Sequence, residues 1–236
     1  VHEAFILAGS ETITTCNYAV TPAAGLGDRL EELTGLAGRL AAEARAACEE
    51  RGYRGVRICG SLPPLVESYR PDLVLPREQA APIYARIARA LLPSADIFLA
   101  ETMASIDEAR SAVLGAREAS PDREIWASFT LGADGRLRSG EPAPVAVDSM
   151  LDMGASAVLF NCSEPEAIGS ALGELRAAAD VDARRRAAGV RLRAYANRLT
   201  PVPADFAMAS STAPQAMRGD LDPARYADFA DQWIAL

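Results

Sequence analysis

The sequence predicts an α/β fold, a (β/α)8 TIM barrel whose first and last strands are missing from the chain. Short apolar, β-branched runs alternate with amphipathic helical stretches, which implies parallel strands joined by right-handed crossovers. Three of these runs, ICGSL, IFLAE and AVLFN, are almost continuously apolar, as expected for strands that are covered on both faces. The length of 236 residues, half of them hydrophobic, suits a barrel, which typically needs about 250 residues.

Six segments have the length and residue types of strands, namely 11–16, 55–62, 96–102, 124–131, 157–163 and 191–197. Helices are expected between and around them, at 1–10, 28–51, 77–92, 105–118, 145–154, 164–179 and 223–236. Ser105 is a suitable N-cap for one of these helices, and Gly154 is a suitable end for another. The strands and helices therefore alternate along almost the whole chain.

The same alternation also fits an open six-stranded sheet, and that alternative stays open. No GxGxxG follows a predicted strand and no GxxxxGK[ST] is present, so a nucleotide-binding doubly wound sheet has no positive support. The chain starts inside a predicted helix and stops after one, so each end lacks the neighbouring strand of a barrel. We therefore expect a single barrel domain over residues 1–236, incomplete at both ends.

Composition excludes several classes of function. The formal net charge of -8 argues against nucleic acid as a partner, because phosphate binding needs a basic patch. No run of about 18 apolar residues and no signal peptide is visible, so we expect a cytoplasmic protein without a membrane partner. The only histidine is His2, at the very start, which leaves no triad chemistry and removes the commonest general base.

Polar or soft side chains follow nearly every predicted strand, where the active sites of barrels lie. Glu101 follows the apolar run DIFLA and is well placed at the mouth to hold a cationic group. Cys162 follows AVLFN, and on its own it is as consistent with a small buried hydrophobe as with a metal ligand. Catalytic zinc needs three protein ligands, so one thiol is not a site. Cys48 and Cys59 are expected to be partly buried, reduced thiols.

The motifs, taken in order, resemble those of the zinc-dependent homocysteine S-methyltransferases. The segments that carry the resemblance are AFILAGSETITTCNYAVTP, ICGSLPPLVESYRPDLV, IFLAETMASIDEA, LFNCS, YAN and PARYADFADQWIAL. Each motif is weak alone, but together they run through nearly the whole chain in the family's order. Two departures are visible: Cys16 stands where the family usually has Asn, and Ala196 stands where it has Pro. We interpret Cys16 as a conservative small replacement.

The resemblance implies a (β/α)8 barrel that binds Zn2+ through three cysteine thiolates. One of them is Cys162, and the other two form an adjacent Cys-Cys pair in a strand-eight turn expected beyond Leu236. The first strand, which helps to hold homocysteine, is expected before Val1. The metal is therefore expected to be absent from the chain as given.

The resemblance also implies the reaction and the partners. A methyl group would move from a sulfonium or betaine donor, S-methylmethionine or S-adenosylmethionine above all, to the thiolate of homocysteine, giving methionine. Glu101 would hold the homocysteine amino group, and Asn161, Ser61 and Asn197 would contact the substrate or the residues around it. The donor, and a related thiol or selenol as acceptor, stay open. The alternative is a zinc-free barrel that serves as a binding or interaction protein.

Overall fold

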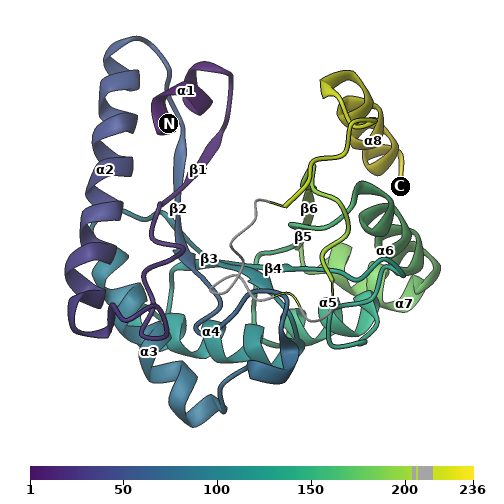
Figure 1. Cartoon of the computed structure of the whole chain (residues 1–236), viewed down its shortest axis with the longest axis horizontal. Coiled ribbons are helices and arrows are strands. Elements are labelled where there is room, and N and C mark those ends of the chain that lie inside the picture. The colour runs from purple at the N-terminus through teal and green to yellow at the C-terminus, as the bar shows by residue number, and fades with distance from the viewer. Residues whose placement is uncertain (204–205, 207–214) are drawn as a thin grey trace. The chain divides into compact units, whose positions relative to one another are not determined.

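A computed structural model describes residues 1–203, 206 and 215–236, which form a sheet flanked by helices (Figure 1). The six strands are β1 (Thr12–Thr14), β2 (Arg57–Leu62), β3 (Ile97–Met103), β4 (Glu124–Phe129), β5 (Ala157–Asn161) and β6 (Arg191–Tyr195). All six predicted strands are confirmed, and their bounds differ from the prediction by a few residues at most. Their short apolar runs therefore predicted the strands well.

The helices follow the predicted alternation. They are α1 (His2–Leu7), α2 (Leu30–Glu50), α3 (Arg77–Leu91), α4 (Ile106–Ala119), α5 (Ala143–Asp152), α6 (Pro165–Ala177), α7 (Ala179–Ala187) and α8 (Pro223–Ala235), with two short 3-10 helices, η1 (Gly27–Arg29) and η2 (Pro71–Leu73). The predicted cap is confirmed, because the Glu108 N–H donates to Ser105 Oγ at 3.2 Å. Gly154 follows α5 with φ of +69°, a left-handed conformation that glycine adopts without strain.

Helix α7 was not predicted, because it has no apolar stripe. None of its residues is buried. Its sequence ADVDARRRA instead places Asp182 one turn before Arg185 and Arg186, and Asp182 forms ion pairs with both. Each pair at this spacing stabilises a helix by only about 0.2–0.5 kcal/mol. Hydrophobic periodicity could not reveal a helix of this kind.

The strands are ordered β1-β2-β3-β4-β5-β6, which is their order in the sequence. The pairs β1–β2, β2–β3 and β5–β6 are parallel, with Thr14 opposite Cys59, Leu62 opposite Ala100, and Asn161 opposite Tyr195. A doubly wound sheet would reverse the strand order at a switch point, and this order has none. The fold is α/β with sequential parallel strands, as in barrels, while the complete eight-stranded barrel and the single domain stay predictions.

The chain divides into two compact units. The first comprises Val1–Val66, Leu75–Ala100 and Ser111–Trp126, and the second Glu67–Val74, Glu101–Arg110 and Ala127–Leu236. In the first unit, Cys48 is buried among apolar residues that include Ile13 and Ile58. Gly60 on β2 has to be glycine, because a Cβ there would lie 2.9 Å from Ala95 Cβ. Cys48 is thus a structural thiol and is more completely buried than the sequence led us to expect.

In the second unit, helices α5 and α6 bury apolar faces, and the neighbouring strand β5 is buried throughout. Phe129 at the end of β4 and Phe160 on β5 are fully buried. This core supports the strand ends from which the candidate site is built. No helix in the described part of the chain is long and apolar enough to cross a membrane.

Candidate functional site

Cys162 is the first residue after β5, at the carboxyl end of the strand, where the sequence placed it. Its N–H donates to the Tyr195 carbonyl at 3.2 Å, which fixes the backbone there to the neighbouring strand. Burial raises the pKa of the Cys162 thiol, and the nearby charge of Glu101 raises it further. Hydrogen bonds with three polar side chains, those of Thr102, Tyr69 and Asn161, lower that pKa. The thiol therefore lies in a partly buried but polar setting, not in an apolar core.

Three residues at this thiol have left-handed backbones. They are Tyr69 (φ +67°), Thr102 (φ +61°) and Cys162 (φ +49°), and no other described non-glycine residue has a positive φ. Such a conformation is a genuine outlier for β-branched Thr and bulky Tyr. It costs about 1–3 kcal/mol for each residue and is typically found where function requires it. The side chains of Tyr69 and Thr102 both interact with the sulfur of the third strained residue, Cys162.

Asn161, the last residue of β5, is fully buried and ties three strands together. Its Oδ1 accepts from the Thr102 N–H at 3.2 Å and from Ser128 Oγ at 2.7 Å. Its Nδ2 donates to Thr102 Oγ1 at 2.8 Å, which leaves the Thr102 hydroxyl proton for the Cys162 sulfur. Both polar atoms of the amide thus have protein partners.

Ser163 and Asn197 extend this hydrogen-bonded network. The Ser163 hydroxyl donates to the Asn161 carbonyl at 2.8 Å and accepts from the Leu131 N–H at 2.8 Å. The Asn197 N–H donates to the Ser163 carbonyl at 3.1 Å, and its Oδ1 accepts from the Leu199 N–H at 3.0 Å. Asn197 is half-buried.

A cavity of about 50 Å³ lies beside Cys162, and we call it the site cavity. Its walls include Tyr69, Arg138, Cys162 and Asn197, all from the second unit. Glu101, half-buried on β3, belongs to the same unit and acts electrostatically on the thiol. Four predicted site residues, Glu101, Asn161, Cys162 and Asn197, are therefore in the second unit.

Ser61, the remaining predicted site residue, lies in the first unit on β2 and is fully buried. Its N–H donates to Thr15 Oγ1 at 2.9 Å, and its carbonyl accepts from Asn17 Nδ2 at 3.0 Å. Thr15 in turn donates to Asn17 Oδ1 at 2.6 Å. These residues form a separate polar cluster after β1, and Cys16 between them is exposed.

Sequence reasoning did not single out Tyr69 or Arg138. Tyr69 lies inside the quoted motif SYRPD, but its left-handed backbone comes from tertiary contacts that no local pattern reveals. Arg138 lies in the loop after β4, in the segment GRLRSG, which carries no motif. The guanidinium of Arg138 stacks over the Tyr69 ring, with its Cζ 5.6 Å from the ring centroid.

The residues around Cys162 meet the requirements of a zinc site only in part. Thiolate is the preferred soft ligand for zinc, and the polar surroundings of Cys162 suit such a role. A catalytic zinc site needs three protein ligands. Among the described residues, no group of three or more His, Cys, Asp or Glu side chains could hold a metal ion. The described residues thus offer one fitting ligand and do not complete the site.

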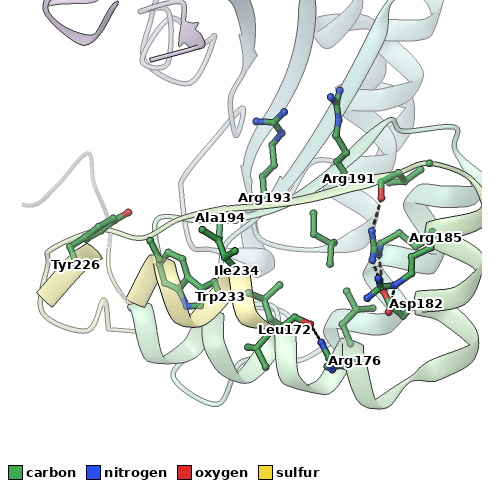
Figure 2. A pocket seen from close by; sticks show the side chains of 17 residues that line it. Leu172, Arg176, Asp182, Arg185, Arg191, Arg193, Ala194, Tyr226, Trp233 and Ile234 are labelled. Carbon is green, nitrogen blue, oxygen red and sulfur yellow. Dashed lines mark hydrogen bonds and ion pairs between the residues drawn. The ribbon is translucent and has the colours of Figure 1, made fainter. Parts of the chain in front are cut away.

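A larger cavity, of about 780 Å³, is lined by β6 and by helices α6, α7 and α8 (Figure 2). Trp233 and Ile234 on α8 face it together with Leu172 on α6, whereas Arg191 and Arg193 extend from the opposite side of β6. None of the predicted site residues lines this cavity. The chemistry is therefore assigned to the Cys162 side.

Comparison with known proteins agrees with this geometry. The sequence model of the homocysteine S-methyltransferase family matches residues 1–236. The structure is similar to the metallated form of the homocysteine methyltransferase MmuM from Escherichia coli, with 27% identity and a TM-score of 0.68 over 85% of this chain and 80% of MmuM. The oxidized form of MmuM gives 25% identity and a TM-score of 0.66 over the same shares. No curated relative matches the sequence.

Proposed function

Because the chain belongs to the homocysteine S-methyltransferase family, we propose that it transfers a methyl group from a sulfonium or betaine donor to the thiolate of homocysteine, giving methionine. S-Methylmethionine and S-adenosylmethionine are the preferred donors. The observation that carries the proposal is the position of Cys162 at the carboxyl end of β5, with Glu101 in the same compact unit. Barrel enzymes perform their chemistry at this end of the strands.

Cys162 is proposed as one thiolate ligand of zinc. Zinc, when bound, would keep the sulfur of homocysteine deprotonated near neutral pH. Because the described residues supply a single thiol, a full site needs two further thiolates. The metallated form of MmuM supports a metal in this family. The residues of this chain are assigned binding and positioning roles only.

Glu101 is proposed to bind the ammonium group of homocysteine. Its half-buried carboxylate already acts on the Cys162 sulfur, so an ammonium group held by Glu101 would bring the rest of the substrate to that sulfur. A charge-assisted hydrogen bond of this kind contributes about 1.5–3 kcal/mol. A methyl donor with a sulfonium or quaternary nitrogen leaves as a neutral group, so no protein base is required.

The other predicted site residues are proposed to act in different ways. Asn161 would position Thr102 and Cys162 rather than contact the substrate, because both polar atoms of its amide have protein partners. Asn197 borders the site cavity and would contact the substrate. Ser61 would contribute through the polar cluster of the first unit. The net charge of -8 favours small-molecule substrates over nucleic acid. A cytoplasmic location without a membrane partner is also part of the proposal.

Replacing Cys162 with Ser tests the proposal, and Cys16→Ser is the matched control because its thiol is exposed. Each variant is made in the intact protein, which also carries the two further thiolates of the proposed site, and is analysed for bound zinc and for homocysteine-dependent methionine formation with each donor. Cys162→Ser should lose both, since a hydroxyl is a far weaker zinc ligand than a thiolate. Cys16→Ser should keep both. A Cys162→Ser protein with stoichiometric zinc and full activity would contradict the assignment. A wild-type protein inactive with every donor would favour a binding protein instead.

A further inference from the structure

Arg138 borders the site cavity and is held in place on several sides. Its Nη2 donates to the carbonyls of Val202 and Pro203, each at 3.0 Å. Its guanidinium stacks over the Tyr69 ring, while the backbone N–H of Arg138 donates to the Thr130 carbonyl at 3.3 Å and anchors the main chain. These contacts fix the side chain, so little conformational entropy is left to lose when a ligand binds.

The charge of Arg138 has no carboxylate partner in the part of the chain that the structure describes. Arginines elsewhere pair readily: Arg218 binds Glu166 and Asp220, and Arg86 binds Glu31. Arg138 is also half-buried, and burial lowers its pKa. A half-buried cation whose hydrogen-bond acceptors, in the described part of the chain, are neutral carbonyls is suited to bind an anion from a ligand.

The size of the site cavity limits what that anion is. A volume of about 50 Å³ accommodates a group of a few heavy atoms. A carboxylate has three heavy atoms and matches the planar fork of a guanidinium. The rest of such a ligand would extend toward Cys162, which borders the same cavity, and toward Glu101, which acts on that sulfur.

We infer that Arg138 binds the carboxylate of an amino-acid substrate of this site and thereby selects substrates that carry one. The inference rests on the proposed function and adds a residue that sets specificity. Arg138 borders the same cavity as Cys162, and Glu101 acts on the Cys162 thiol, so groups of opposite charge are available to a zwitterionic substrate. The carboxylate has two sources, the acceptor homocysteine and an amino-acid donor such as S-methylmethionine. The two sources share the same chemistry and are distinguished by experiment.

The test compares each substrate with an analogue that lacks only the carboxylate. Binding of homocysteine, aminopropanethiol, S-methylmethionine and dimethyl(aminopropyl)sulfonium is measured calorimetrically on the full chain. The variants are Arg138→Met and Arg138→Gln, and the latter can still donate to the Val202 and Pro203 carbonyls. The matched control is Arg136→Met, because Arg136 is exposed in the same loop and donates to the Gly140 carbonyl.

Both Arg138 variants should weaken binding of at least one carboxylate-bearing compound by roughly 10- to 150-fold, the range for a charged hydrogen bond. Binding of its decarboxylated analogue should change by less than about twofold, and Arg136→Met should change neither. Weaker binding of homocysteine would show that Arg138 binds the carboxylate of the acceptor. Weaker binding of S-methylmethionine would show that it binds the carboxylate of the donor. Equal losses with and without the carboxylate, or no loss, would overturn the inference. A wild-type protein that binds none of the compounds would refute the proposed function itself.

Discussion

Thr102 shows how single residues are strained to build the site. Its backbone is left-handed, with φ of +61°, and its buried hydroxyl links the Asn161 amide to the Cys162 sulfur. A β-branched residue avoids this conformation, so the surrounding hydrogen bonds must hold it there. The strained backbone of Thr102 directs its hydroxyl toward the Cys162 thiol.

Paired substitutions at Thr102 measure that strain. Thr102→Ala and Thr102→Gly both remove the hydroxyl, but only glycine adopts a left-handed backbone freely. Thr102→Gly should therefore be more stable than Thr102→Ala by about 1 kcal/mol, measured by urea unfolding. At Thr130, which is buried but not among the left-handed residues, the order should reverse. A Thr102→Ala variant that is the more stable of its pair would show that no strain is stored.

Glu108 is a second residue with an unusual environment. It is 5% exposed, and burial raises its pKa to about 7, although the Ala104 N–H donates to its carboxylate at 2.7 Å and lowers that pKa. The folded pKa lies above the ordinary value of 4.5, so the folded state binds the proton more tightly. The associated stability is present below pH 4.5 and is lost as the pH rises through about 7.

Glu108→Gln should remove this pH dependence. The shift of about 2.5 pKa units corresponds to about 3 kcal/mol, so the variant should be more stable than the wild type by that order at pH 8 and similar to it at pH 4. Glutamine can still accept from the Ala104 N–H. Unfolding free energies at the two pH values test this, with exposed Asp107→Asn as control. If the variant and the wild type differ in unfolding free energy by the same amount at pH 4 and at pH 8, Glu108 does not titrate in this range.

At the scale of elements, Asn161 connects the ends of β3, β4 and β5 through Thr102 and Ser128. Asn161→Ala would leave the buried Thr102 N–H and the Ser128 hydroxyl without this acceptor. Each such loss costs about 1–3 kcal/mol, so the variant should be less stable by about 2–6 kcal/mol in denaturant unfolding. Asn197→Ala, at a half-buried position, should cost much less. Equal losses at the two positions would show that Asn161 does not hold the strand ends together.

At the scale of the whole molecule, the sequence predicted the elements better than their interactions. The six strands were predictable because burial on both faces leaves continuous apolar runs such as AVLFN. The positions of Cys162 and Glu101 followed from the same runs. The position of Tyr69 beside Cys162, and the stacking of Arg138 on it, depend on residues far apart in the chain. No local pattern encodes such contacts, nor the hydrogen bonds that the Asn161 amide makes with Thr102 and Ser128.

Methyl transfer to homocysteine is the central claim, and one isotope measurement tests it most directly. The purified intact protein, which includes the two further thiolates of the proposed site and is supplied with zinc, is incubated with isotope-labelled homocysteine and unlabelled S-methylmethionine or S-adenosylmethionine. The products are analysed by mass spectrometry. The label on homocysteine separates new methionine from the methionine that S-methylmethionine leaves behind. We predict labelled methionine that carries one donor methyl group and that forms only when the protein is present. Labelled homocysteine recovered unchanged with every donor would contradict the account.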